Sequence, residues 1–185
     1  MLRPMRRVMI IGQPGSGKST LARQVAEIAH LPVIHADQLH WKPGWVERSQ
    51  EEKLPLFVKA AMREAWVFDG NHSRSTELRL NRADTIIWLD LPVGLRLWRV
   101  GRRVLRWHGR TRPDLPEGCP EQFDAEFLRY IWRTRRSGRA KCAALAERAR
   151  PDQTVQHLRA PREIRAYLAA LRHAASLGNL GISHR

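Results

Sequence analysis

Eight residues near the start of the chain fit a loop that binds phosphate. The run GQPGSGKS at positions 12–19 matches the pattern G-x-x-x-x-G-K-[S/T], in which glycines let backbone amides curl around a phosphate group. Lys18 would reach the β and γ phosphates of a nucleotide, and the Ser19 hydroxyl would reach Mg²⁺. The apolar run 7–11 predicts the buried strand that must precede this loop, and helical spacing after Gly17 predicts the helix that must follow it. The candidate nucleotide-binding residues are Gly12, Gly15, Ser16, Gly17, Lys18, Ser19 and Thr20.

Two carboxylates are the next candidates for chemistry. Asp37 and Asp69 each follow an apolar run that reads as a strand, so we expect both at the edge of the sheet where the γ-phosphate would lie. One could organise Mg²⁺ through its waters, and the other could accept a proton from an incoming hydroxyl. Capping of a helix or turn is the alternative for both residues. A third strand-end acid, Asp90, is expected to cap the helix that follows it.

Arginine dominates the basic residues of this chain. The formal net charge is +15, and only five of the 33 basic residues are lysines. Phosphoryl transfer depends on neutralising charge, and arginine forms bidentate contacts with phosphate, so arginines beside a mobile loop are candidate catalytic groups. A solvated, structural role is the alternative for each of them. The candidates are Arg102, Arg103, Arg110 and Arg112 around a Gly/Pro-rich segment at about 109–121, and Arg133, Arg136 and Arg139 on the helix after it.

Strands and helices alternate along the chain, and this alternation predicts an α/β fold with a parallel five-stranded sheet flanked by helices. The predicted strands are 7–11, 32–37, 66–70, 85–90 and 154–158. The predicted helices begin at 17, 50, 93, 122 and 161, and the second should begin with a capping box formed by Ser49 and Glu52. The third, 93–107, carries apolar residues on one side and arginines on a neighbouring stripe, and the fourth runs to 139.

The length of 185 residues predicts one domain, at 1–175, with a lid at about 109–121 and a disordered tail at 176–185. Cys119 and Cys142 lie far apart and outside any C-x-x-C pattern, which argues against disulfides and a four-cysteine zinc site and favours a cytoplasmic location. No run of eighteen apolar residues and no cleavable leader precedes the phosphate loop, so we expect no membrane partner.

Several longer motifs resemble one family. GQPGSGKST, HADQLHWKPGW, FDGNHSRS, ADTIIWLDLP and RTRPDLPEGCPEQFDAEFLRYIW are similar to segments of the adenylate-kinase-like P-loop proteins, and most closely of the bacterial branch labelled DNA topology modulation proteins. This resemblance implies ATP with Mg²⁺ on Gly12–Ser19 and a metal-proximal carboxylate at Asp69, beside Ser19. It also implies that Arg102 and Arg103 contact adenine or phosphate, and that Arg110 and Arg112 are lid arginines.

The acceptor of the phosphate stays open between two classes. The family's usual D-G-F-P-R holds an arginine for the phosphate of a nucleotide acceptor, whereas the run here is DGNHSR at 69–74, with the arginine displaced by one residue. Asp37 falls where related kinases, such as those for shikimate, carry an acid that binds the acceptor. The acceptor is therefore either a nucleoside monophosphate or a hydroxyl-bearing metabolite.

Together these features predict an ATP-dependent phosphotransferase that acts on a small acceptor, working as a monomer or dimer. Lys18, Asp37 and Asp69, with the arginines Arg110, Arg112, Arg133 and Arg136, are its candidate catalytic residues. The alternative is a nucleic-acid-associated ATP-binding protein that affects DNA topology, with its arginine helices along the phosphate backbone. A GTPase switch is less favoured, because the sequence has no N-K-x-D motif to recognise guanine.

Overall fold

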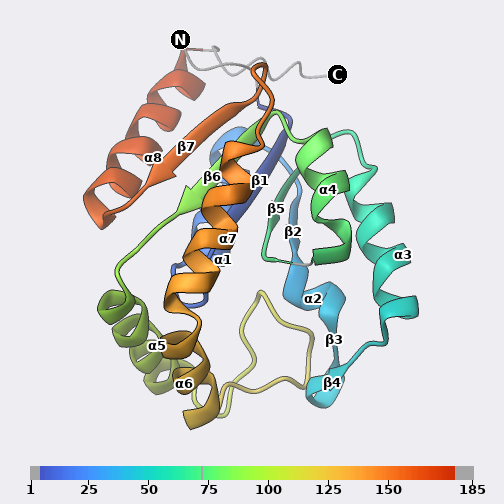
Figure 1. Cartoon of the computed structure of the whole chain (residues 1–185), viewed down its shortest axis with the longest axis vertical. Helices are drawn as coiled ribbons and strands as arrows, with labels where there is room; N and C mark the ends of the chain where they lie inside the picture. Colours follow the sequence, from blue (N-terminus) through green and yellow to red (C-terminus); the bar gives the residue numbers. More distant parts are fainter. Residues whose placement is uncertain (1–4, 72, 178–185) are drawn as a thin grey trace.

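A five-stranded parallel sheet forms the centre of the molecule (Figure 1). We describe residues 5–71 and 73–177 of a computed structural model. The strand order is β2-β5-β1-β6-β7. The strands are β1 (Arg7–Gly12), β2 (Val33–His35), β5 (Trp66–Asp69), β6 (Thr85–Leu89) and β7 (Thr154–Leu158). The inner strands β1, β5 and β6 are almost wholly buried, as their continuous apolar sequences require of strands covered on both faces.

Helices cover both faces of the sheet and complete a three-layer sandwich (Figure 1). On one face α1 (Lys18–Ala29) and α8 (Pro161–Ser176) enclose an aliphatic core with the sheet. On the other face α3 (Gln50–Ala61), α4 (Ser73–Arg82) and α7 (Arg135–Glu147) pack over an aromatic core. Phe57, Trp66 and Phe68 are fully buried there, and burial of each such side chain contributes roughly 1.5–3 kcal/mol.

The remaining elements gather beyond the carboxyl ends of the strands, at the bottom of Figure 1. Helices α5 (Val93–Trp107) and α6 (Ala125–Arg133) flank an irregular loop at 108–124. Opposite them lie α2 (Ala36–His40) and a small hairpin made of β3 (Trp41–Lys42), a 3₁₀ turn (Pro43–Trp45) and β4 (Val46–Glu47). The ligand site of an open parallel sheet is expected at this edge.

Much of the predicted layout is confirmed. The parallel five-stranded sheet is present, β7 has the predicted bounds, and Ser49 forms a capping box with Glu52 at the start of α3. Helix α8 continues to Ser176, the first residue of the predicted tail at 176–185, and the tail from 178 onward lies outside the described residues. No described helix is both long enough and apolar enough to cross a membrane.

Three local predictions are wrong. Strand β2 stops at His35, so Asp37 lies in the first turn of α2, where the helix dipole favours its negative charge. The predicted helix 122–139 is two helices broken at Thr134, whose hydroxyl donates to the Tyr130 carbonyl oxygen at 2.7 Å. Asp90 does not cap α5, because Pro92 occupies the cap position. The Asp90 carboxylate instead accepts hydrogen bonds from Arg139 and His157.

Gly70, directly after β5, lies at the carboxyl edge of the sheet, where Ala36 leaves no room for a side chain. Its φ is +93°, and a Cβ atom there would lie 2.5 Å from the Cβ of Ala36. We expect Gly70→Ala to lower the free energy of unfolding by about 1–3 kcal/mol, because it adds both backbone strain and overlap. Gly94→Ala, inside α5 with no atom within 4 Å of the added methyl, should raise it by up to about 1 kcal/mol. Urea unfolding of both variants measures the difference, and equal effects would contradict this account.

Candidate functional site

The phosphate-binding loop is shaped by close contacts that only glycine allows. A Cβ atom on Gly12 would lie 2.7 Å from the Leu89 carbonyl oxygen, and one on Gly15 would lie 2.7 Å from the Arg96 carbonyl oxygen. Both glycines have positive φ, +154° and +77°. Inside the loop, Ser16 is fully buried, and its hydroxyl has no hydrogen-bond partner among the described residues. A buried polar atom without a partner is costly, so this cradle fits a phosphate oxygen.

Two arginines of α5 brace the loop from its outer side. Arg96 donates from Nη1 to the Pro14 carbonyl oxygen at 3.1 Å, and Arg99 donates from Nη1 to the Ser16 carbonyl oxygen at 2.8 Å. Because these loop carbonyls are taken up by guanidinium groups, the loop can present its amides to a ligand. Sequence reasoning placed both residues only on a basic helix stripe, because nothing local to α5 indicates which arginines meet the loop.

A cavity of about 780 Å³ extends from the loop along α5 toward α8 and under the 108–124 loop. Lys18 lies in its wall and donates from Nζ to the Gln13 carbonyl oxygen at 3.2 Å. Burial lowers the pKa of Lys18, and the negative charges of Asp69 and Asp37 oppose that shift. Ser19 and Thr20 line the same cavity. Its size suits a nucleotide with a small acceptor.

Asp37 and Asp69 both face this cavity. Asp69 ends β5 and is buried, with Oδ1 3.0 Å from Nδ1 of His35, while its Oδ2 has no partner among the described residues. The Asp37 side chain is exposed at the mouth of the cavity, yet partial loss of solvation there raises its pKa, and the neighbouring Asp69 charge raises it further, against the opposing effect of Lys18. With two carboxylates beside a lysine in one cavity, one carboxylate can bind a metal ion while the other accepts a proton.

His35 is a site residue that sequence reasoning missed. It is buried, and it pairs with Asp69 in the register of the parallel strands β2 and β5. Its ring holds one carboxylate oxygen of Asp69, and the other oxygen has no hydrogen-bond partner among the described residues. No clear signal in the sequence marks this pair, because the predicted second strand ran on to Asp37 and the register of β2 with β5 is a tertiary feature.

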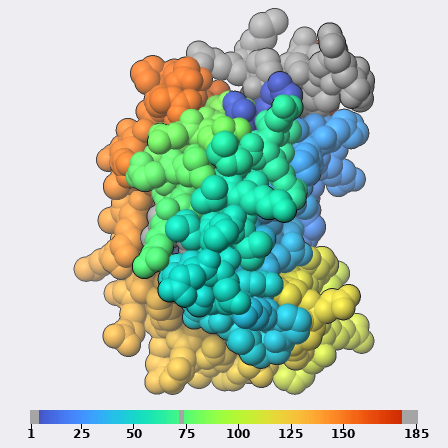
Figure 2. Space-filling view, turned by 90° about the vertical axis from the view of Figure 1, so that its right-hand side faces the viewer, coloured from blue at the N-terminus to red at the C-terminus, as the bar shows by residue number. Residues whose placement is uncertain are grey.

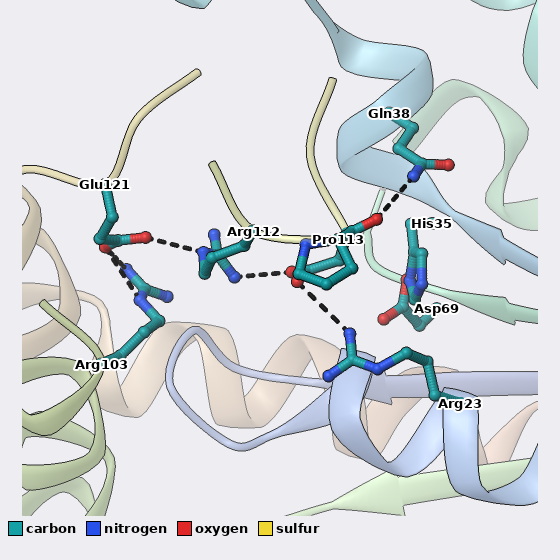
Figure 3. A network of polar contacts seen from close by, with 9 residues as sticks. Arg23, His35, Gln38, Asp69, Arg103, Arg112, Pro113 and Glu121 are labelled. Carbon is teal, nitrogen blue, oxygen red and sulfur yellow. Dashed lines mark hydrogen bonds and ion pairs between the residues drawn. The ribbon is translucent and has the colours of Figure 1, made fainter. Parts of the chain in front are cut away.

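The 108–124 loop is held by a network of arginines and carboxylates (Figure 3). Arg112 lies 2.6 Å from Asp114 and 2.7 Å from Glu121, and Arg103 also contacts Glu121, at 2.8 Å. Arg23 of α1 reaches Asp114 at 3.4 Å. Asp114 and Glu121 are both almost fully buried, so these ion pairs are shielded from solvent.

The loop is also joined to the opposite side of the cavity. Gln38 of α2 donates to the Pro113 carbonyl oxygen, and the indole of Trp45 donates to the Pro120 carbonyl oxygen, both at 3.0 Å. The Gly44 amide donates to the Gly118 carbonyl oxygen at 2.9 Å. Figure 2 shows this yellow segment lying directly against the blue and cyan surface of α2 and the hairpin. The loop therefore spans the cavity from α5 to α2.

The predicted arginines separate into three groups. Arg102, Arg103 and Arg112 line the cavity, together with the unpredicted Arg99. Arg110 and Arg133 are exposed and do not line it. Arg136 and Arg139 line a separate cleft. A closing motion of the loop stays a prediction.

The cavity contains few protein groups for a metal. Across residues 5–71 and 73–177 there is no cluster of three or more His, Cys, Asp or Glu side chains with metal-binding geometry. Ser19 and Asp69 both line the cavity, and Asp69 keeps one oxygen without a protein partner. This sparse set fits Mg²⁺, which keeps several waters and takes one or two protein ligands beside substrate phosphates.

Comparisons of sequence with known proteins give two matches. A model of the "ATPase family associated with various cellular activities (AAA)" matches residues 8–90. Shikimate kinase from Baumannia cicadellinicola subsp. Homalodisca coagulata is 30% identical over 138 residues, which cover 66% of this chain and 76% of that protein.

Solved structures of kinases share the fold. Shikimate kinase from Acinetobacter baumannii, in complex with shikimate, superposes with a TM-score of 0.53 at 15% identity, covering 97% of this chain and 96% of that one. Shikimate kinase from Bacteroides thetaiotaomicron gives 0.54 at 18% identity, covering 93% and 99%. A gluconokinase from Sinorhizobium meliloti 1021 gives 0.50 at 19% identity, covering 96% and 99%.

The buried ion pairs of Glu121 predict how firmly the 108–124 loop is held. Glu121→Gln removes the charge that Arg103 and Arg112 share, and a hydrogen bond to a charged group, such as the one that Arg103 donates to Glu121, is worth about 1.5–3 kcal/mol. Hydrogen exchange of the Gly109 and Glu121 amides, which bond within the loop, should become at least about tenfold faster. Glu117→Gln, an exposed carboxylate of the same loop, is the control. Unchanged exchange in Glu121→Gln would show that the network does not hold the loop.

Proposed function

The chain belongs to the shikimate kinase family of P-loop kinases, ATP-dependent phosphotransferases with small acceptors, and we propose that its own acceptor is a hydroxyl-bearing metabolite. The observation that carries this proposal is the placement of Asp37 and Asp69 with Lys18 around one cavity, at the mouth of the phosphate loop. A carboxylate that can take a proton is what a hydroxyl acceptor needs, whereas a phosphate acceptor needs nearby cations.

The cavity wall beside the two acids favours a hydroxyl over a nucleotide phosphate. Arg74, the displaced arginine of the family motif, is exposed and does not line the cavity. Gly70 and Asn71 occupy that wall instead, and the Asn71 amide donates to the Gly12 carbonyl oxygen at 3.1 Å. An anionic acceptor placed there would face two carboxylates.

The residues of this chain suggest how the phosphates of ATP are held. The loop amides and the buried Ser16 hydroxyl surround the β and γ phosphates, and Lys18 neutralises their charge. Arg103 and Arg112 reach the same cavity from α5 and the 108–124 loop, where they can balance charge that develops during transfer. Arg102 lines the cavity as well, as expected for a contact to adenine or phosphate.

Asp37 is assigned as the general base. Its carboxylate takes the proton of the acceptor hydroxyl as that oxygen forms a bond to the γ-phosphorus. The bond from the γ-phosphorus to the β–γ bridging oxygen breaks, and ADP leaves with that electron pair. The raised pKa of Asp37 makes its carboxylate a stronger base than an ordinary aspartate.

Asp69 and Ser19 are assigned to Mg²⁺, with His35 as a positioning residue. The Asp69 oxygen left without a protein partner and the Ser19 hydroxyl are the groups that would hold the ion or its waters. When bound, Mg²⁺ neutralises negative charge on the β and γ phosphates. His35 fixes the Asp69 side chain through its other oxygen.

A nucleic-acid function rests on the net charge and on the resemblance to DNA topology modulation proteins, and it accounts for less of the structure. Arg96 and Arg99 of the basic helix bind carbonyl oxygens of the phosphate loop rather than forming a stripe open to a nucleic acid. The narrower resemblance to DNA topology modulation proteins therefore stays a prediction that we rank second. A cytoplasmic monomer or dimer is the form that we propose for the kinase.

The proposed reaction is tested with a panel of hydroxyl acceptors and nucleoside monophosphates. We expect a hydroxyl metabolite to yield a phosphorylated product with stoichiometric ADP, detected by mass spectrometry. Lys18→Ala should reduce kcat/KM by about 10³-fold or more, because a charge contact made in the transition state is lost. If wild-type protein binds ATP but phosphorylates only nucleoside monophosphates, or no member of a broad panel, the proposed acceptor class is wrong.

The pH dependence of turnover tests the role of Asp37. Protonated Asp37 cannot accept the acceptor's proton, so kcat should fall as pH falls through the raised pKa of this carboxyl, above the ordinary aspartate range. Asp37→Asn should lower kcat by about 10²- to 10⁴-fold, abolish that acid limb and spare ATP affinity. Asp152→Asn, outside the cavity, is the control. An unchanged limb in Asp37→Asn would assign the base elsewhere.

A further inference from the structure

A second cleft opens where the phosphate-binding loop meets α5 and α7. Its volume is about 380 Å³, and it is separate from the nucleotide cavity. Gln13 of the loop, the turn Asp90–Pro92 and the first turn of α5 form one side of it. The first turn of α7 and Arg159, which precedes α8, form the other side. None of the chemistry assigned above uses this cleft.

The lining of the cleft is strongly positive. Five guanidinium groups and one carboxylate face it: Arg96, Arg135, Arg136, Arg139, Arg159 and Asp90. The carboxylate of Asp90 is already matched, since Arg139 donates to it at 2.9 Å and His157 lies 3.1 Å from it. Four formal positive charges are thus left without a carboxylate in the cleft.

The arginines of the cleft are of two kinds. Arg96 and Arg135 are held by the fold: Arg96 donates to the Leu91 and Pro14 carbonyl oxygens, and Arg135 donates to the Trp132 carbonyl oxygen. Arg136 and Arg159 are exposed, and neither side chain has an ion pair or hydrogen bond within the part of the chain that the structure describes. The cleft therefore contains arginines that the fold holds in place and arginines that are free to turn toward a ligand.

We propose that this cleft is a second anion site, which binds the phosphate group of inorganic phosphate or of a small phosphate monoester. Guanidinium forks match phosphate oxygens in pairs, and several of them converging on one hollow favour a dianion over chloride. The volume admits a phosphate group with a small attached moiety, and Arg136 and Arg159 close on it from α7 and from the segment before α8.

The cleft shares residues with the nucleotide site. The Gln13 side chain donates to the Thr134 and Arg135 carbonyl oxygens at 3.1 and 3.0 Å, so the phosphate loop is joined to the start of α7. Arg96 contacts the loop at Pro14 and lines the cleft. A phosphate in the cleft is thus bound by the same framework that shapes the loop, without occupying it.

The test is calorimetric titration of the full chain with phosphate while saturating Mg²⁺ and ADP fill the nucleotide cavity. Inorganic phosphate is titrated in one arm and glycerol 3-phosphate in another, at constant ionic strength. We expect one further anion per chain, with a Kd at least about tenfold larger in Arg136→Ala/Arg159→Ala. Whichever compound has the lower Kd shows whether the cleft binds free phosphate or a phosphate monoester. Arg63→Ala/Arg172→Ala removes the same charge from exposed positions outside the cleft and should bind as wild type does.

Three results would overturn the proposal. The first is that neither phosphate binds once ADP is saturating. The second is that both double variants weaken binding equally, which would reduce the effect to net charge. The third is that only duplex DNA binds, with an affinity that falls steeply with salt and is not competed by either phosphate, which would make this surface a contact for nucleic acid. None of these outcomes depends on the kinase assay, so the anion site and the proposed reaction are tested independently.

Discussion

The structure depends on how closely its phosphate loop is approached by the neighbouring backbone. The Leu89 carbonyl at the end of β6 and the Arg96 carbonyl in α5 press against Gly12 and Gly15, at distances that exclude any side chain. That approach brings α5 close enough for Arg96 and Arg99 to bind the loop's carbonyls. A larger residue at Gly15 would push α5 away and weaken both braces, whereas one at Gly12 would press on the end of β6.

Many arginine side chains of this protein donate hydrogen bonds to its own main chain. Beyond the two braces, Arg79 donates to the Gly70 carbonyl oxygen, and Arg82 donates to the Ala61 carbonyl oxygen, both at 2.8 Å. Arg150 similarly donates to the Asn81 carbonyl oxygen at 2.6 Å. Such contacts satisfy carbonyls at the ends of helices and strands, and they use the planar fork that lysine lacks. A net charge of +15 is therefore in part a property of how the fold is built.

The sequence was sufficient for features that depend on local pattern. The phosphate loop follows from its glycine spacing, the inner strands from their apolar runs, and the start of α3 from the Ser49 and Glu52 pair. It was insufficient where tertiary contacts decide. The α6–α7 break at Thr134 coincides with the bonds from Gln13, which is distant in sequence. The same is true of Arg96 and Arg99, whose partners lie in another element.

The hydrogen bonds between the 108–124 loop and α2 with its hairpin use the loop's main chain. Gln38, Gly44 and Trp45 all donate to carbonyl oxygens of the loop, which every residue type provides. Side chains of this loop can therefore be exchanged during evolution without loss of those anchors. Relatives that share this docking could change the molecules they accept by altering a handful of loop residues, which makes the loop a natural place to diversify in a directed-evolution library.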